Sequence, residues 1–220
     1  MTKKEVQIDF ERQARIGLSE AVLCEGKSPA QIEYIVSLLI DRDETLLLTR
    51  LGARTFDELS AACRDRIDFD VVSGTGIIGA HASPDGPASV AIVAAGSSDI
   101  AIVREASRTL AFYGESADEF IDIGVAGLWR VLEKREKLDE YSVLIVVAGM
   151  DGALFSVLGG LVGSVVIAVP AATGYGTSHA GTTALHAALA SCAPGVVAVN
   201  IGNGYGAACA ALRVLRAARK

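Results

Sequence analysis

The chain has 220 residues and a formal net charge of −6, and 51% of its residues are hydrophobic although only 5% are aromatic. This length fits one large domain or two small ones, and it is long enough to bury a hydrophobic core. The acidic balance argues against nucleic acid as a partner, because contact with phosphates requires a basic face. A small anionic ligand is compatible with this charge, since backbone N–H groups can bind it.

The apolar and cysteine residues exclude further classes of protein. The longest apolar runs, Val143–Met150 and Leu161–Pro170, are too short to span a bilayer, and the charged start Met1–Glu5 does not resemble a signal peptide. No CxxC spacing occurs, so neither a disulfide framework nor a zinc site is predicted from Cys24, Cys63, Cys192 and Cys209. We therefore expect a cytoplasmic protein with no membrane partner.

The first 88 residues predict a small α/β domain. A helix is expected over Ile8–Ala21, although residues 21–24 also suit a short strand. Ser28 is a good N-cap before Pro29, and the apolar spacing that follows predicts a helix through Ile40. The remaining expected elements are a strand over Leu46–Thr49, a short helix over Asp57–Cys63 and an edge strand over Ile67–Val72.

The pattern changes after Ser83–Pro87, a Pro- and Gly-containing segment that we interpret as a linker. Runs rich in Val and Ile then alternate with helical segments, which predicts a parallel, doubly wound sheet. The expected strands are Val90–Ala95, Ile121–Ile123, Val143–Ala148, Val165–Val169 and Val196–Ile201. The expected helices are Ile100–Tyr113, Gly127–Lys134, Ala153–Leu161, Thr182–Ala190 and Tyr205–Arg219.

Ligands of such sheets bind beyond the carboxyl ends of the strands, so the residues after each strand are the site candidates. All five strand ends carry Gly or a Pro/Gly turn, and N–H groups at the following helix starts favour an anion. For a single loop, turn geometry or helix capping is a sufficient explanation, and the full set favours a nucleotide-like ligand. The candidate binding residues are Gly96, Ser97, Ser98, Asp99, Gly124, Gly127, Gly149, Met150, Gly174, Tyr175, Gly176, Asn203 and Gly204.

Three further features carry possible chemistry. Asp151 follows a predicted strand, and its carboxylate suits a general base, a metal ligand or a helix cap. Cys192 lies in a turn between a helix and a strand, which normally lies at the opposite edge of the sheet from the site. On that basis Cys192 is a structural thiol, unless an irregular turn or a subunit interface brings it to the site. Residues 74–79 have GxGxxG spacing, but no clear helix follows, so a dinucleotide fingerprint is not predicted.

Several stretches occur in a recognisable order: 96–99 (GSSD), 122–128 (DIGVAGL), 147–154 (VAGMDGAL), 170–176 (PAATGYG), 191–195 (SCAPG) and 199–206 (VNIGNGYG). They resemble the LarB family of nickel-pincer cofactor carboxylase/hydrolases, within the phosphoribosylaminoimidazole carboxylase (PurE-like) superfamily. The turn at 25–28 resembles the family's N-terminal domain, so nearly the whole chain is covered. The resemblance implies a small N-terminal α/β domain over 1–88 and a PurE-like three-layer αβα domain with a parallel sheet over 89–220.

The activity implied by this resemblance is carboxylation of nicotinic acid adenine dinucleotide at pyridine C5. Hydrolysis of the phosphoanhydride follows and releases AMP and pyridinium-3,5-biscarboxylic acid mononucleotide. The family's nucleophilic cysteine occupies the position of Cys192, which reverses the structural interpretation above. In the same scheme Asp151 takes a proton or holds Mg²⁺. CO₂ or bicarbonate is the implied co-substrate, an NAD-like dinucleotide an implied ligand and a homo-octamer the implied assembly, and no nickel is bound by the protein itself.

The sequence departs from the LarB pattern at three positions: Asp151 stands where Glu is usual, Trp129 where His is usual, and Gly202 where Asp is usual. These changes keep open a non-catalytic nucleotide-binding paralogue. A second alternative is an aminoimidazole ribonucleotide carboxylase or mutase. Such enzymes carry a His after the third strand, and Ala153 stands at that position.

Overall fold

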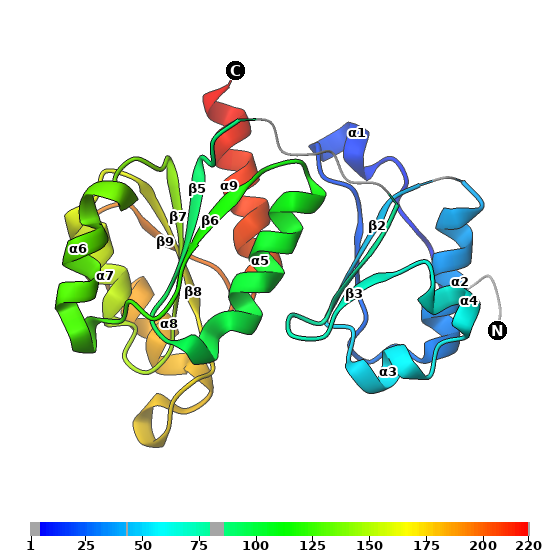
Figure 1. Ribbon diagram of the computed structural model, residues 1–220, viewed down its shortest axis with the longest axis horizontal. Helices are drawn as coiled ribbons and strands as arrows, with labels where there is room; N and C mark the ends of the chain where they lie inside the picture. The colour runs from blue at the N-terminus through cyan, green and yellow to red at the C-terminus, as the bar shows by residue number, and fades with distance from the viewer. Residues whose placement is uncertain (1–4, 43, 80–85, 220) are drawn as a thin grey trace. The chain divides into compact units, whose positions relative to one another are not determined.

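The computed structural model describes residues 5–42, 44–79 and 86–219, and the chain divides into two compact units, residues 1–82 and 83–220 (Figure 1). The predicted linker over 83–87 includes residues 83–85, which lie outside the described residues. Within the described ranges no helix combines the length and the apolar character that crossing a membrane requires.

The N-terminal unit contains a four-stranded sheet in the order β1 (Ala21–Leu23), β2 (Leu46–Thr49), β4 (Thr75–Ile78), β3 (Asp68–Asp70). β1 is parallel to β2, and the other pairs are antiparallel. The helices are α1 (Arg12–Ile16), α2 (Pro29–Ile40), α3 (Ala53–Asp57) and α4 (Ala61–Arg64). A small α/β architecture is thus confirmed, with the predicted edge strand at one end of the sheet.

Helix α2 begins where the sequence predicts. The Ser28 hydroxyl accepts the Gln31 N–H at 3.3 Å, and the Gln31 side-chain oxygen accepts the Ser28 N–H at 2.9 Å, so the two residues form a capping box. Pro29 occupies the first turn, where its missing N–H has no helical partner to lose. The buried face of α2 packs against the sheet through Ile32, Ile35, Val36 and Leu39.

Two predictions for this unit are wrong, and one strand was missed. The helix expected over Ile8–Ala21 shrinks to α1, because Gly17 adopts a left-handed φ of 76° and ends it, and residues 21–23 pair with β2 instead. The helix expected over Asp57–Cys63 is replaced by the ends of α3 and α4, between which Ser60 is extended. Strand β4 was not predicted. Pairing on both of its sides, with β2 and β3, outweighs its glycine content.

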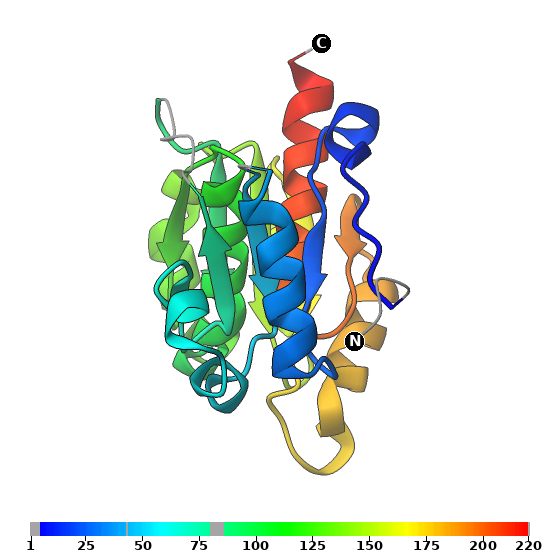
Figure 2. The same cartoon turned by 90° about the vertical axis from the view of Figure 1, so that its right-hand side faces the viewer.

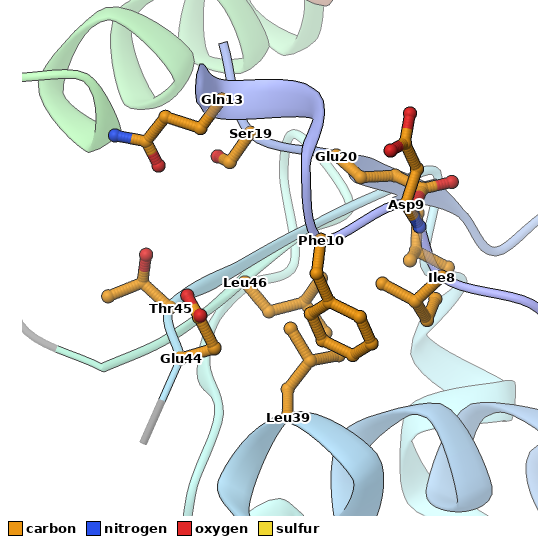
Figure 3. A pocket seen from close by; sticks show the side chains of 11 residues that line it. Ile8, Asp9, Phe10, Gln13, Ser19, Glu20, Leu39, Glu44, Thr45 and Leu46 are labelled. Carbon is orange, nitrogen blue, oxygen red and sulfur yellow. Dashed lines mark hydrogen bonds between the residues drawn. The ribbon is translucent and has the colours of Figure 1, made fainter. Parts of the chain in front are cut away.

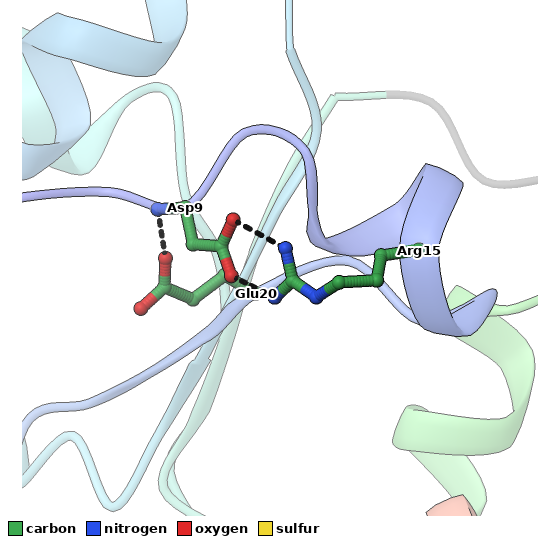
Figure 4. Close-up of polar contacts among 3 residues, drawn as sticks. All are labelled: Asp9, Arg15 and Glu20. Atoms are coloured by element: carbon green, nitrogen blue, oxygen red, sulfur yellow. Dashed lines mark hydrogen bonds and ion pairs between the residues drawn. The ribbon is translucent and has the colours of Figure 1, made fainter.

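Two carboxylates and one guanidinium organise the segment that enters β1 (Figure 4). Glu20 accepts the backbone N–H of Asp9 at 2.5 Å, and the Arg15 guanidinium donates to the Asp9 carboxylate at 2.5 Å. This hydrogen bond with Arg15 holds the pKa of Asp9 below its ordinary value. The pair is solvent-exposed, so its contribution is to orient the segment before α1.

The C-terminal unit contains a five-stranded, wholly parallel sheet in the order β6-β5-β7-β8-β9. Its strands are β5 (Val90–Ala94), β6 (Ala117–Phe120), β7 (Val143–Ala148), β8 (Val165–Pro170) and β9 (Val196–Ala198). Helices α5 (Ile100–Phe112) and α9 (Gly204–Ala218) cover one face, and α6 (Leu128–Leu138), α7 (Ala153–Leu161) and α8 (Thr182–Leu189) cover the other (Figure 1). The predicted three-layer αβα arrangement is therefore confirmed.

The central strands explain the apolar runs in the sequence. All residues of β5 and β7 are buried, as expected for strands covered on both faces. The strand predicted over Ile121–Ile123 is wrong, because the pairing strand β6 precedes it. β6 lies at the edge of the sheet, where the exposed Asp118 and Glu119 are tolerated and no apolar run is needed.

The strand order creates one topological switch point, between β5 and β7. From β5 the chain moves outward to β6, and it then returns past β5 to form β7. Helices α5 and α6 consequently begin on opposite faces of the sheet, and a crevice opens at the carboxyl ends of β5 and β7. Residues 171–181, which include the short helix η3 (Gly176–Gly181), extend beyond this edge of the sheet (Figure 2).

Ser28→Ala should destabilise α2 by about 1 kcal/mol, because the Gln31 N–H loses its side-chain acceptor and keeps only its bond to the Ser28 carbonyl at 3.0 Å. Hydrogen exchange of α2 amides in the full chain measures this as faster opening. Ser37→Ala is the matched control, since Ser37 lies exposed in the same helix and its hydroxyl donates to the Tyr34 carbonyl without capping an end. Equal exchange in both variants would contradict the role of the capping box.

The N-terminus of α4 should weaken in acid. The Glu33 carboxylate accepts the Ser60 N–H at 2.6 Å, and this bond lowers the pKa of Glu33. A lowered pKa in the folded state stabilises the protein above the unfolded-state value near 4.5, and the stabilisation is lost as the pH falls through the folded-state pKa. Protection factors of α4 amides should fall over that range in the parent chain and change less in Glu33→Gln. Glu25→Gln, at an exposed turn, should behave as the parent chain does.

Candidate functional site

A pocket of about 560 Å³ lies at the switch point of the C-terminal sheet. Four of the five strand ends contribute to it, those of β5, β6, β7 and β8. Its lining residues are Ala95, Gly96, Ser98, Asp99, Gly124, Val125, Ala126, Ala148, Gly149, Met150, Asp151, Ala153, Leu154, Thr173 and Ser178. A volume of this size suits a small organic ligand.

Asp99 is buried in the wall of the pocket, with 2% of its surface exposed. One carboxylate oxygen accepts the Gly96 N–H at 3.2 Å, and the other accepts the Thr173 hydroxyl at 3.0 Å. Burial raises the pKa of Asp99, and these two hydrogen bonds oppose that rise without cancelling it. Both oxygens thus have partners within the chain, and the carboxyl links the β5 end to the β8 end.

Thr173, in the loop after β8, constrains the backbone at the end of β7. The Met150 N–H donates to the Thr173 carbonyl at 2.8 Å, and Met150 adopts a left-handed φ of 50°. A Cβ at Gly149 would lie 2.1 Å from the same carbonyl oxygen, so a side chain is excluded there. Glycine at this strand end therefore permits close approach of the loop after β8.

Asp151 lies exposed at the start of α7. Its carboxylate accepts the Ala153 N–H at 3.2 Å, which is the arrangement of a helix cap. The second carboxylate oxygen has no hydrogen bond to any residue that the structure describes. Asp151 therefore combines a capping role with an oxygen that faces solvent at the pocket.

Backbone amides are available on both sides of the crevice. The short helices η1 (Ser97–Asp99) and η2 (Val125–Gly127) precede α5 and α6. Within the described residues, no backbone hydrogen bond uses the N–H groups of Ser97, Ser98, Val125 or Ala126. Such N–H groups at helix starts attract anions, because the helix dipole adds to their own partial charge.

Several predicted residues lie outside the pocket lining: Ser97, Gly127, Gly174, Tyr175, Gly176, Asn203 and Gly204. Asn203 accepts the Gly206 N–H at 2.7 Å and caps α9. Gly204 is buried against α5, where a Cβ would meet the Ile102 carbonyl at 2.6 Å, and its N–H donates to Glu105 at 2.8 Å. The β9 end is thus occupied by contacts between α9 and α5.

Cys192 is exposed, and it is not a pocket residue. Its turn joins α8 to the amino end of β9, at the opposite edge of the sheet from the pocket. The Ser191 hydroxyl lies 2.8 Å from that of Ser156, which holds the turn against α7. A Cβ at Gly159 would meet Val196 and Ala193 within 3 Å, so this glycine lets the turn pack closely on the helix.

The other two positions that depart from the LarB pattern, besides Asp151, are Gly202 and Trp129. Gly202 has a left-handed φ of 64°, and its N–H donates to the Pro170 carbonyl at 2.8 Å, so glycine suits the backbone there. Trp129 is 60% exposed on α6, with the Arg130 guanidinium 5.7 Å from its ring centre. Arg130 also forms an ion pair with Asp122 at 3.0 Å.

Thr173 and Ser178 are polar pocket residues that the sequence did not predict. Thr173 lies inside the PAATGYG stretch, but only its glycines and Tyr175 were selected. Ser178 follows that stretch and is buried. A hydroxyl residue inside a loop after a strand is the available signal, and it is weak because exposed threonines are common in loops.

A Mg²⁺ site can be tested against the donors present. Among the described residues, no three His, Cys, Asp or Glu side chains gather in a way that could hold a metal ion. Asp151 offers one carboxylate, and the Asp99 oxygens already accept hydrogen bonds within the chain. Mg²⁺ commonly binds one or two carboxylates together with water and substrate phosphates. The residues therefore fit an ion that arrives with phosphates, and they do not fit a site built from protein ligands alone.

The N-terminal unit also contains a hollow, of about 30 Å³ (Figure 3). Phe10, Leu39 and Leu46 form its apolar side, and Glu20 and Thr45 are among its polar residues. This volume accommodates roughly one water molecule. It is too small for a nucleotide. A second hollow of this unit, of about 460 Å³, is lined by residues 7–11 and Arg42 and involves no strand-end loop. The C-terminal pocket, to which four strand ends contribute, is therefore the candidate site.

Comparisons with known proteins agree with this division of the chain. Residues 2–78 match the LarB/PurE-like N-terminal domain, and residues 89–220 match AIR carboxylase. An uncharacterized protein of Methanocaldococcus jannaschii is 34% identical over 212 residues, covering 93% of this chain and 82% of its own. Crystal structures of Treponema denticola PurE and a PurE2 variant share 23% and 24% identity, each with a TM-score of 0.45, covering 58% of this chain and 79% of their own.

The two domain matches occur in order along one chain, and the second covers more than half of it. The AIR carboxylase domain is that of carboxylase/mutase-type enzymes. With a LarB-type N-terminal domain followed by an AIR carboxylase domain, the chain belongs to the LarB family of the PurE-like superfamily.

Proposed function

We propose that the protein carboxylates nicotinic acid adenine dinucleotide at pyridine C5 and hydrolyses its phosphoanhydride, releasing AMP. One observation carries this proposal: a pocket of about 560 Å³ lies at the switch point of an AIR carboxylase domain that follows a LarB-type domain. CO₂ or bicarbonate is the co-substrate. The product then serves the synthesis of a nickel-pincer cofactor.

Backbone amides of the pocket support binding of the diphosphate. Those of Ser98, just before α5, and of Val125 and Ala126, just before α6, are available for its oxygens. Apolar side chains, including Ala153 and Leu154, line the same pocket and suit an aromatic ring. The Asp99 oxygens accept hydrogen bonds from Gly96 and Thr173, so they do not compete with the diphosphate for the amides of Ser98, Val125 and Ala126.

The proposed chemistry is covalent catalysis by Cys192. Its thiolate forms a bond to C4 of the electron-poor pyridinium ring, and an electron pair moves onto the ring nitrogen. The enamine carbon C5 then attacks CO₂ to form the new C–C bond. A base removes the C5 proton, and expulsion of the thiolate restores aromaticity. Attack of water on the phosphoanhydride separates AMP from the carboxylated mononucleotide.

Cys192 of one chain and the pocket of the same chain belong to opposite edges of the sheet. We therefore propose that a second copy of the chain delivers its Cys192 to the pocket in a homo-oligomer, an octamer being the family's assembly. Exposed apolar side chains on α6, which follows the pocket residues 124–126, support an assembly: Leu128, Trp129 and Leu132.

Asp151 is the proposed proton acceptor at the pocket. It is a pocket residue with one carboxylate oxygen outside the helix cap. The same oxygen suits an interaction with Mg²⁺ carried by the diphosphate. When bound there, Mg²⁺ would neutralise part of the diphosphate charge.

The direct test incubates the protein with nicotinic acid adenine dinucleotide, bicarbonate and Mg²⁺ and analyses the products by mass spectrometry. We expect AMP and a dicarboxylated mononucleotide, with product formation abolished in Cys192→Ala because no nucleophile remains. Cys209→Ala is the control, since Cys209 lies in α9 and is not a pocket residue. Turnover of aminoimidazole ribonucleotide, or saturable binding without product, would instead favour the alternative enzyme or a non-catalytic paralogue.

Asp151→Asn separates the chemical role of Asp151 from its capping role. Asn retains a cap acceptor but loses the charge, so the melting temperature should change little while kcat falls by about 10²- to 10⁴-fold. Asp151→Glu should recover much of kcat, because it restores the carboxylate. A kcat for Asp151→Asn close to that of the parent chain would eliminate Asp151 as the base.

A further inference from the structure

Thr173 forms hydrogen bonds with two other strand-end loops. Its hydroxyl donates to the Asp99 carboxylate at 3.0 Å, in the loop after β5. Its carbonyl accepts the Met150 N–H at 2.8 Å, in the loop after β7. Thr173 itself follows β8, so one residue connects the ends of three strands around the pocket.

The packing around these bonds leaves little freedom for a different arrangement. Gly149 lies so close to the Thr173 carbonyl that even a methyl group is excluded. Met150 is held at a φ of 50°, a conformation that non-glycine residues adopt at some cost. Asp99 further anchors the Gly96 N–H, so the contact reaches the loop that contains Ser97 and Ser98.

We infer that Thr173 is a positioning residue for nucleotide binding, which sets the relative positions of the three loops that form the pocket wall. The inference rests on the proposed function only for the identity of the ligand. The Thr173 side chain is exposed to solvent, so removing its hydroxyl leaves no cavity in the core. Its effect should therefore fall on the pocket rather than on global stability.

The electrostatics of Asp99 give the hydroxyl particular importance. Burial raises the pKa of Asp99, and the hydrogen bond from Thr173 opposes that rise. Without the hydroxyl, a buried carboxylate loses one of two donors, and the loop after β8 loses its side-chain bond to the loop after β5. Valine has nearly the shape of threonine and no hydroxyl, so it isolates this bond.

The test compares Thr173→Val with Thr173→Ser, which keeps the hydroxyl. Binding of AMP and of nicotinic acid adenine dinucleotide is measured by calorimetry on the full chain. We expect about tenfold weaker binding for Thr173→Val and recovery to within about threefold for Thr173→Ser. The matched control is Thr182→Val, because Thr182 is also exposed and its hydroxyl donates to the His179 carbonyl, outside the pocket. It should bind as the parent chain does.

Hydrogen exchange provides a second readout that does not need a ligand. In Thr173→Val, the Gly96 and Met150 amides should exchange faster while the amides of β7 keep their protection. If the parent chain binds neither nucleotide, the proposed function fails, and the exchange result alone decides the positioning role. Unchanged exchange at Gly96 and Met150, or unchanged affinity in a parent chain that binds, would overturn the inference.

Discussion

The reversal of the strand order at β5, with β6 on one side and β7 on the other, is the constraint on which the candidate site depends. Because β6 and β7 lie on opposite sides of β5, the helices that follow β5 and β6 start on opposite faces of the sheet. A crevice is therefore expected at the carboxyl ends of β5 and β7, between the starts of these two helices. The pocket lies at this point, and amides from the starts of both helices are available beside it.

The glycines around this crevice serve contacts between loops as much as any approach of a ligand. At Gly149 the excluded volume belongs to the Thr173 carbonyl, and at Gly124 a Cβ would lie 2.6 Å from the Ala95 carbonyl. Close packing of strand-end loops explains why short loops with little side-chain bulk occur there. Two polar groups of the wall, the Asp99 carboxylate and the Thr173 hydroxyl, form a hydrogen bond with each other, so the wall is held together by contacts within the chain.

The proposed chemical role of Cys192 does not match its position within a single chain. The family assignment makes it the proposed nucleophile, while its turn belongs to the opposite edge of the sheet from the pocket. The close packing of this turn on α7, through the Ser156–Ser191 contact and Gly159, fixes where the thiol emerges. The proposed delivery of Cys192 by a second copy accounts for both, and under that proposal activity depends on assembly.

The sequence by itself determined the buried strands, the helices between them, the capped start of α2 and the strand ends that line the pocket. These features depend on local periodicity and capping, which neighbouring residues encode. Only the tertiary structure decided that β4 is a strand, that the pairing edge strand is Ala117–Phe120, and that Asn203 and Gly204 serve α9. It also decided the role of Thr173, because its partners Asp99 and Met150 are distant in sequence, and long-range pairing leaves no periodic signal.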